Sequence, residues 1–161
     1  MATVSYLRCP TEDGAERLFK RLFDLQKQGL IKIEDAAIVT WSKGSTRPRT
    51  RQLTELSAAG ALDGAFWGLL FGAIFFVPLA GAAVGAAWGA IRGAFADYGI
   101  NDELIEELRR KVTEGTSALF LMSSAGVMDK VVPALKDIPF EISATTLSKE
   151  QEEKLRAAFG R

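Results

Sequence analysis

Residues 58–96 have the sequence AAGALDGAFWGLLFGAIFFVPLAGAAVGAAWGAIRGAFA, and this apolar stretch decides the fold. Its glycines recur at every fourth position on either side of Pro78. They are Gly60, Gly64, Gly68 and Gly72 before the proline, and Gly81, Gly85, Gly89 and Gly93 after it. Four residues nearly complete one helical turn, so each quartet lies along one helix face. Rows of small residues let helix backbones approach closely in membranes. The pattern predicts a glycine-zipper helical hairpin that turns at Pro78.

A hairpin is expected rather than one long helix because strand-like sequences lie on both sides of the stretch. A single membrane crossing would place residues 1–57 and 97–161 on opposite sides, and neither half has enough strands to cover its apolar faces. A hairpin returns the chain to the side that it left. We therefore predict one discontinuous α+β domain, residues 1–57 and 97–161, which is interrupted by the hairpin at 58–96.

The depth of the hairpin in a bilayer stays open at this point. The uncharged stretch 64–77 has about 14 residues, which span roughly 21 Å as a helix, whereas a full crossing needs about 20 residues. Longer arms include Asp63 and Arg92, which lie at nearly equal distance from the turn. These two either form an ion pair, or Arg92 reaches a lipid phosphate while Asp63 faces water. A re-entrant hairpin and a hairpin packed inside a soluble oligomer are the alternatives.

The flanks of the hairpin predict its orientation. Trp67 and Trp88 fall at similar depth, where they either form an interfacial belt or supply packing bulk. Basic residues lie on both sides: Lys43, Arg47, Arg49 and Arg51 precede the hairpin, and Arg92, Arg109, Arg110 and Lys111 lie at its end or beyond. Both ends therefore belong on the cytoplasmic side of the cell membrane. The N-terminus has neither the basic region nor the apolar core of a signal peptide.

The remaining sequence predicts alternating strands and helices. Strands are expected over 3–8, 36–41, 49–54, 118–122 and 140–145, and helices over 15–25, 102–112, 127–137 and 149–159. The first six elements have the βαββαβ order of a ferredoxin-like sandwich, followed by a C-terminal αβα extension. Gly29 and Gly115 are placed to end helices. Ser148 and Gln151 have the spacing of a capping box that begins the last helix.

Arg47, Arg49 and Arg51 alternate along the strand expected over 49–54 and its approach, so they point to one face. They are suited to contact anionic lipid headgroups beside the hairpin. A solvated edge strand, protected from aggregation by its charge, explains the same pattern equally well.

Composition argues against several classes of function. Lys and Arg equal Asp and Glu at 20 each, so no net charge attracts nucleic acid. Histidine is absent, which removes the commonest general base and metal ligand. The single cysteine, Cys9, is expected to be a buried, inert thiol. We predict no catalytic residues, no cofactor and no metal site.

Several blocks of this sequence resemble a family of uncharacterised bacterial proteins known only as membrane proteins of unknown function. They are LQKQGLIKIEDAAIV (25–39), GALDGAFWGLLFG (60–72), PLAGAAVGAAWGA (78–90), YGINDELIEEL (98–108), SALFLM (117–122) and LSKEQEEKLRAAF (147–159). The resemblance implies a bacterial source, membrane association and no assigned activity.

We therefore expect a non-enzymatic, membrane-associated structural or regulatory protein that contacts lipids and forms homo-oligomers through the hairpin. A pore is one alternative, but residues 65–91 contain no Ser, Thr, Asn or charged residue to line a hydrated channel. A soluble oligomer that buries its hairpins in a common core is another. An enzyme is the least favoured, because no set of nucleophile, base and orienting residue is visible.

Overall fold

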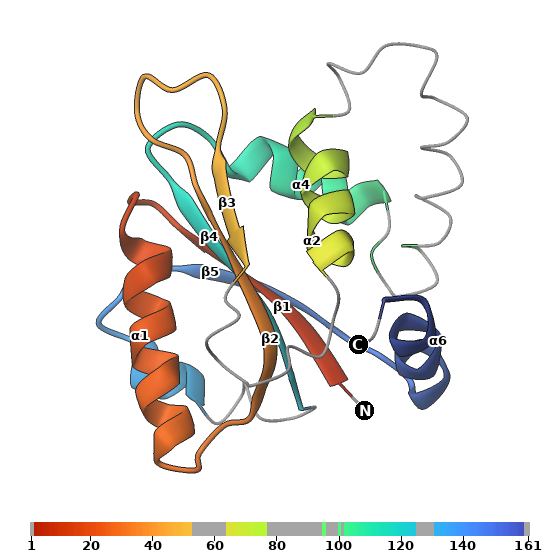
Figure 1. Ribbon diagram of the computed structural model, residues 1–161. Coiled ribbons are helices and arrows are strands. Elements are labelled where there is room, and N and C mark those ends of the chain that lie inside the picture. Colours follow the sequence, from red (N-terminus) through yellow and green to blue (C-terminus); the bar gives the residue numbers. More distant parts are fainter. Residues whose placement is uncertain are drawn as a thin grey trace, which may run out of the picture.

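The computed structural model describes residues 2–52, 64–76, 95, 100, 102–124 and 131–159 (Figure 1). In chain order the elements are β1 (Ala2–Cys9), α1 (Gly14–Lys27), β2 (Ile33–Thr40), β3 (Arg49–Gln52), α2 (Gly64–Phe71), the π-helix η2 (Gly72–Phe76), α4 (Asp102–Lys111), β4 (Ser117–Ser124), the 3-10 helix η5 (Val132–Leu135), β5 (Glu141–Thr146) and α6 (Lys149–Phe159).

The described strands form a five-stranded antiparallel sheet in the order β3-β2-β4-β1-β5. The expected α+β class is thus confirmed. Strand β4 lies in the middle and pairs along its whole length with β1, from Ala2↔Ser124 to Cys9↔Ser117. One sheet therefore contains strands from before and after the glycine-rich stretch.

The strand order differs from the one that the first six expected elements would give. In that arrangement β3 would lie between β1 and β2, whereas the position between them is occupied by β4. Among the described strands, β3 pairs with β2 alone and lies at the edge. The physical reason lies in the side chains, because residues 118–122 of β4 are buried on both faces. Arg49 and Arg51 make β3 suitable for an edge but not for the interior.

Helices cover both faces of the sheet (Figure 1). On one face, α1 and residues 131–138 pack over β1, β2 and β4, and the shared core contains Leu7, Leu18, Leu22, Ile38, Leu119, Leu121 and Leu135. On the other face lie α2, η2, α4 and α6, and that core contains Tyr6, Val39, Trp67, Ile105, Phe120 and Leu155. Alternate residues of β1, β2 and β4 supply the two cores, as the pleat of a strand requires.

Local signals in the sequence are confirmed at two helix boundaries. Gly29 follows α1 with a φ of +78°, in the left-handed region where glycine is favoured. At the start of α6, the Ser148 N–H donates to Gln151 Oε1 at 3.0 Å, and the Gln151 N–H donates to Ser148 Oγ at 3.1 Å. These reciprocal bonds are the expected capping box.

The helix expected over 127–137 is shorter and of another type where the structure describes it. Val132–Leu135 is a 3-10 helix, and Pro133 at its start lacks the N–H that a continuous α-helix needs. Arg21 of α1 holds this segment by donating from two nitrogens to the Asp137 carboxylate, both at 2.8 Å. Val131 and Leu135 are buried, whereas Val132 is only half-buried.

The close contact between β1 and the start of α1 generates a prediction about Gly14. A Cβ added there would lie 2.4 Å from Cys9 Cβ and 2.9 Å from Cys9 Sγ. Gly14→Ala should therefore lower the free energy of unfolding by about 1–3 kcal/mol through overpacking, although alanine favours helix. Urea unfolding followed by circular dichroism measures the change.

The matched control is Lys20→Ala on the exposed side of the same helix. This variant should stay within about 0.5 kcal/mol of the parent protein. Equal stability of the Gly14→Ala and Lys20→Ala variants would contradict the contact between β1 and α1.

Candidate functional site

The described part of the glycine-rich stretch, α2 and η2, is called the arm here, and it packs on the sheet. Trp67, Leu70, Phe71 and Ile74 are all buried, and they belong to one core with Tyr6, Phe120 and Met122. Their spacing of three, four and seven residues is typical of one helix face that turns toward a core. The arm therefore belongs to the hydrophobic core on one face of the sheet.

Aromatic contacts join this arm to the central strand. Phe71 and Phe120 meet edge to face with ring centroids 5.0 Å apart, and Trp67 meets Phe120 in the same way at 6.4 Å. Tyr6 of β1 approaches Phe120 at 5.0 Å. Such pairs stabilise a fold by roughly 0.5–1.5 kcal/mol each beyond the area that they bury. Trp67 therefore supplies packing bulk here, which was one of its two expected roles, while Trp88 lies outside the described residues.

Helix α4 holds the C-terminal end of the arm. Arg109 Nε donates a hydrogen bond of 2.8 Å to the carbonyl oxygen of Ile74 in η2, and Arg109 also pairs with Glu106 at 3.1 Å. From the sequence, Arg109 was expected only to be one of the basic residues that flank the hairpin. Its contact with Ile74 could not be inferred from spacing, because the two residues lie 35 positions apart in the chain.

Gly64, Gly68 and Gly72 are the described members of the first glycine quartet, here called the glycine row. The row runs along the arm beside the face that packs on the sheet. Gly68 is exposed, and no described atom lies within 4 Å of a Cβ built on it. Gly64 begins α2, and Gly72, which begins η2, is half-buried. The other residues that were predicted to shape the hairpin lie outside the described residues: Gly60, Asp63, Pro78, Gly81, Gly85, Gly89, Arg92 and Gly93.

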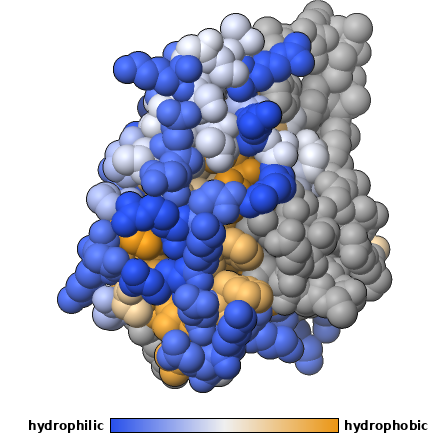
Figure 2. Space-filling view, turned by 60° about the vertical axis from the view of Figure 1, so that its left-hand side comes forward, coloured by the Kyte–Doolittle hydropathy of each residue, from blue (hydrophilic) through white to orange (hydrophobic). Residues whose placement is uncertain are grey.

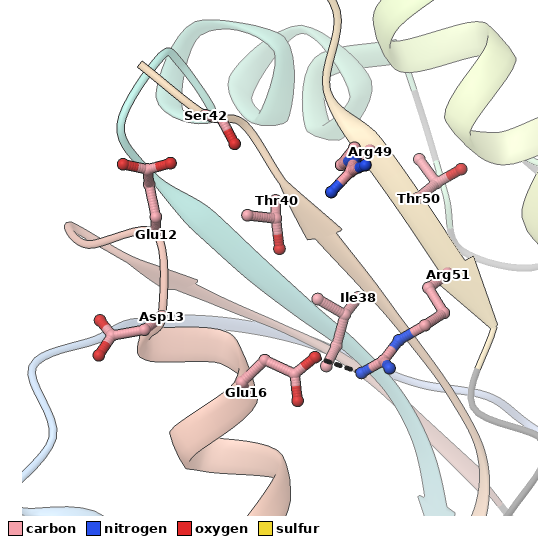
Figure 3. A pocket seen from close by; sticks show the side chains of 9 residues that line it. All are labelled: Glu12, Asp13, Glu16, Ile38, Thr40, Ser42, Arg49, Thr50 and Arg51. Atoms are coloured by element: carbon pink, nitrogen blue, oxygen red, sulfur yellow. Dashed lines mark hydrogen bonds and ion pairs between the residues drawn. The ribbon is translucent and has the colours of Figure 1, made fainter. Parts of the chain in front are cut away.

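Two of the three arginines line a pocket on the opposite face of the sheet. Arg49 and Arg51 pair in register with Thr40 and Ile38 of β2, and Ile38 belongs to the core beneath α1. Arg51 forms an ion pair with Glu16 at the start of α1 (Figure 3). Arg47 is exposed and precedes β3. The arm and these arginines thus lie on different faces, and the expected headgroup contacts stay a prediction.

The pocket has a volume of about 570 Å³. It is lined by Glu12, Asp13, Glu16, Ile38, Thr40, Ser42, Arg49, Thr50 and Arg51 (Figure 3). The face of the molecule that carries α1 is largely hydrophilic, and hydrophobic residues reach its surface only in small separate patches (Figure 2). Sequence spacing revealed the arginines but not the acidic residues that lie across from them.

The buried titratable groups of the two cores are held in their neutral forms. Burial raises the pKa of the Cys9 thiol to about 11, and it raises the pKa of the Tyr6 phenol as well. Cys9 is fully buried, as expected, and its lack of reactivity stays a prediction. Among the described residues, no group of three or more His, Cys, Asp or Glu side chains is placed to hold a metal ion.

A family model described as a protein of unknown function, DUF1269, matches residues 61–160. The chain belongs to the DUF1269 family. The matched region includes the hairpin arm, α4, β4, β5 and α6, while β1, α1, β2 and β3 precede it. Because β1 separates β4 from β5 in the sheet, the DUF1269 region needs the preceding strands to complete its fold.

No curated protein and no solved structure matches this DUF1269 chain. Across the part of the chain that the structure describes, none of the helices combines the length and the apolar character needed to cross a membrane. Because the family is described as one of unknown function, membership assigns no activity to this chain.

The raised pKa of Cys9 predicts how its reactivity depends on pH. Only the thiolate is nucleophilic, so the folded chain should react slowly with iodoacetamide at pH 8 and faster only as the pH approaches about 11. Because the folded pKa lies above the unfolded one, the thiol stabilises the fold below pH 9 and loses this contribution as the pH rises through about 11.

Mass spectrometry of the alkylated protein measures the reaction of Cys9, with the chain unfolded in urea as the control. Equal rates for the folded and unfolded chains at pH 8 would contradict the burial of Cys9.

Docking of the arm predicts a large effect of truncating Trp67. Trp67→Ala should lower the free energy of unfolding by about 3–5 kcal/mol, because a fully buried aromatic side chain leaves a cavity. Trp67→Phe keeps an aromatic ring beside Phe120 and should cost less than half of that. Urea unfolding measures both variants, and an alanine variant within about 1 kcal/mol of the parent would refute the docked arm.

Proposed function

We propose that this DUF1269 protein is a non-enzymatic, membrane-associated structural or regulatory protein that forms homo-oligomers through the hairpin at 58–96. The observation that carries the proposal is the two-sided character of the arm. Its aromatic face packs on the sheet, while Gly68 in the glycine row stays exposed with no described atom near its Cβ position. One side of the arm is thereby used by the domain, and the other is open to a second helix.

The cost of the glycines supports a helix partner for this open side. Glycine inside a helix destabilises it by roughly 0.5–1 kcal/mol relative to alanine. Eight glycines in register therefore call for a compensating contact, and close packing of two backbones supplies one. In the proposal, the glycine rows pack within one hairpin and between hairpins of neighbouring subunits.

The domain that carries the hairpin is proposed to be a ferredoxin-like sandwich. Its core would consist of β1-α1-β2 and β4-η5-β5, with β3 added at one edge and α6 at the end. The order β2-β4-β1-β5, with every neighbouring pair antiparallel, supports this assignment. The basic residues that flank the hairpin support placing this domain at the cytoplasmic face of the cell membrane.

A second candidate is a soluble assembly that buries the hairpins in its core. It is favoured by the burial of Trp67, Leu70, Phe71 and Ile74 against the protein's own sheet, because these side chains are thereby unavailable to lipid. In this candidate the glycine rows make the same contacts between subunits without a bilayer around them.

Cell fractionation distinguishes the two candidates. Expressing cells are lysed, the membrane pellet is washed with alkaline carbonate, and the protein is followed by immunoblot. Retention in the washed pellet is the expected result for an inserted hairpin. Release as a large particle in the absence of detergent would overturn membrane insertion and favour the soluble assembly.

The glycine contact itself predicts different effects of two substitutions at one position. Gly68→Leu should reduce the oligomer to smaller species, because a large side chain separates the helix backbones. Its effect on the fold of one subunit should be small, since the described structure leaves room at this position. Mass measured by light scattering, in detergent if the protein is retained in membranes, reports the assembly.

Gly68→Ala is the matched control, because alanine still permits close packing and gains up to about 1 kcal/mol of helix propensity. This variant should keep the parent mass. An unchanged mass for Gly68→Leu would show that the glycine row makes no contact between subunits.

A further inference from the structure

The pocket between α1 and the β2-β3 edge has the size of a small-molecule site. Its volume of about 570 Å³ lies within the range of roughly 300–1,000 Å³ that is usual for ligand pockets. Ile38, which is buried, is the apolar residue of its lining, and Thr40 and Ser42 add hydroxyl groups. The hairpin arm packs on the other face of the sheet, so this pocket is separate from the proposed assembly surface.

Charges of opposite sign line opposite sides of this pocket. Figure 3 shows Glu12 and Asp13, at the start of α1, on one side of Thr40 and Ser42, and Arg49 of β3 on the other. The two sides are tied together by the ion pair between Arg51 and Glu16, which crosses from β3 to α1. The pocket therefore has acidic residues on the α1 side and basic residues on the β3 side.

The charges that remain are not satisfied within the described chain. Arg49 has no hydrogen-bond or ion-pair partner among the described residues, unlike Arg51. The carboxylates of Glu12 and Asp13 likewise have none there, and the Asp13 side chain does not cap α1. Glu12, Asp13 and Arg49 are exposed residues of the pocket lining, and Figure 3 shows the Asp13 side chain directed away from Thr40. The guanidinium of Arg49 and the carboxylate of Glu12 are therefore the charges available to a ligand.

A ligand with a single charge matches only one wall. An anion beside Arg49 would be repelled by the acidic residues, since the lining contains three carboxylates and two guanidinium groups. A cation beside Glu12 would leave Arg49 without a partner. A zwitterion allows a charge-assisted hydrogen bond at each wall.

We propose that this pocket binds a small zwitterion of the free α-amino acid class. The carboxylate of the ligand accepts hydrogen bonds from Arg49, its ammonium group donates to Glu12, and its side chain lies toward Ile38. The hydroxyl groups of Thr40 and Ser42 lie between the two walls, where they can donate to the carboxylate or accept from the ammonium group.

The test is a calorimetric titration of the 161-residue chain with L-alanine, L-glutamine and L-leucine at millimolar concentration. Each amino acid is compared with its amide, which lacks the carboxylate, and with its N-acetyl form, which lacks the ammonium group. At least one free amino acid should bind, and both of its analogues should bind at least about tenfold more weakly, since each loses a charge-assisted contact.

Variants locate the binding in the pocket. Arg49→Gln and Glu12→Gln should each weaken the binding of the free amino acid by about tenfold or more. Arg47→Gln is the matched control, because Arg47 is an exposed arginine just before β3 that does not line the pocket. Circular dichroism spectra of all three variants should match the parent spectrum.

Three results would overturn the proposal. They are the absence of heat from every free amino acid, equal binding by the N-acetyl form, and binding that survives Arg49→Gln unchanged. Equal binding by the N-acetyl form would identify an anion site instead. None of these outcomes depends on membrane retention or oligomer mass, so the pocket and the proposed function can fail separately.

Discussion

The pairing of β4 with both β1 and β2 is the interaction on which the rest of the structure depends. Residues 118–122 supply both cores, with Ala118, Phe120 and Met122 on one face and Leu119 and Leu121 on the other. Without β4, the strands β1 and β2 have no common partner in the sheet. Since β4 follows the glycine-rich stretch in the chain, the domain cannot complete its sheet until the chain returns from that stretch. The glycine-rich stretch is therefore preceded and followed by strands of the same sheet.

Phe120 connects this central strand to the arm. Its ring meets Tyr6, Trp67 and Phe71 with centroid distances between 5.0 and 6.4 Å. The arm is thus fixed to the sheet by its aromatic face and to α4 by the hydrogen bond from Arg109 to Ile74. These two attachments determine which side of α2 remains open. The direction in which the glycine row faces is consequently fixed by the contacts of the arm with the sheet and with α4.

Much of the local structure could be predicted because it depends on neighbouring residues. The capping box at Ser148 and the end of α1 at Gly29 require only a few adjacent side chains, and both are confirmed. The edge position of β3 was also foreseen as one explanation of its arginines. A continuous apolar run is typical of a strand buried on both faces, so the run at 118–122 carried a signal that β4 lies centrally.

What could not be predicted depends on distant parts of the chain. The order of elements along the sequence does not determine which strand enters between β1 and β2. The first six expected elements would place β3 there, whereas β4 occupies this position. The docking of the arm could not be predicted because α2 is apolar on all sides. Its sequence does not distinguish the face formed by Trp67, Leu70 and Phe71 from the others. The pocket joins Glu16 to Arg51, and no short spacing relates those two residues.

In this interpretation, one face of the sheet binds the ligand and the other packs against the arm. Strand β2 contributes residues to both faces. Ile38 of β2 faces the pocket, whereas Ala37 and Val39 belong to the core beneath the arm. A ligand that binds only the folded chain stabilises it by mass action. Coupling to the assembly would require more, namely two arrangements of the strand to which the ligand binds with different affinity. Because neighbouring residues of β2 are packed in two dense cores, the simplest expectation is that ligand binding and assembly contribute additively to stability.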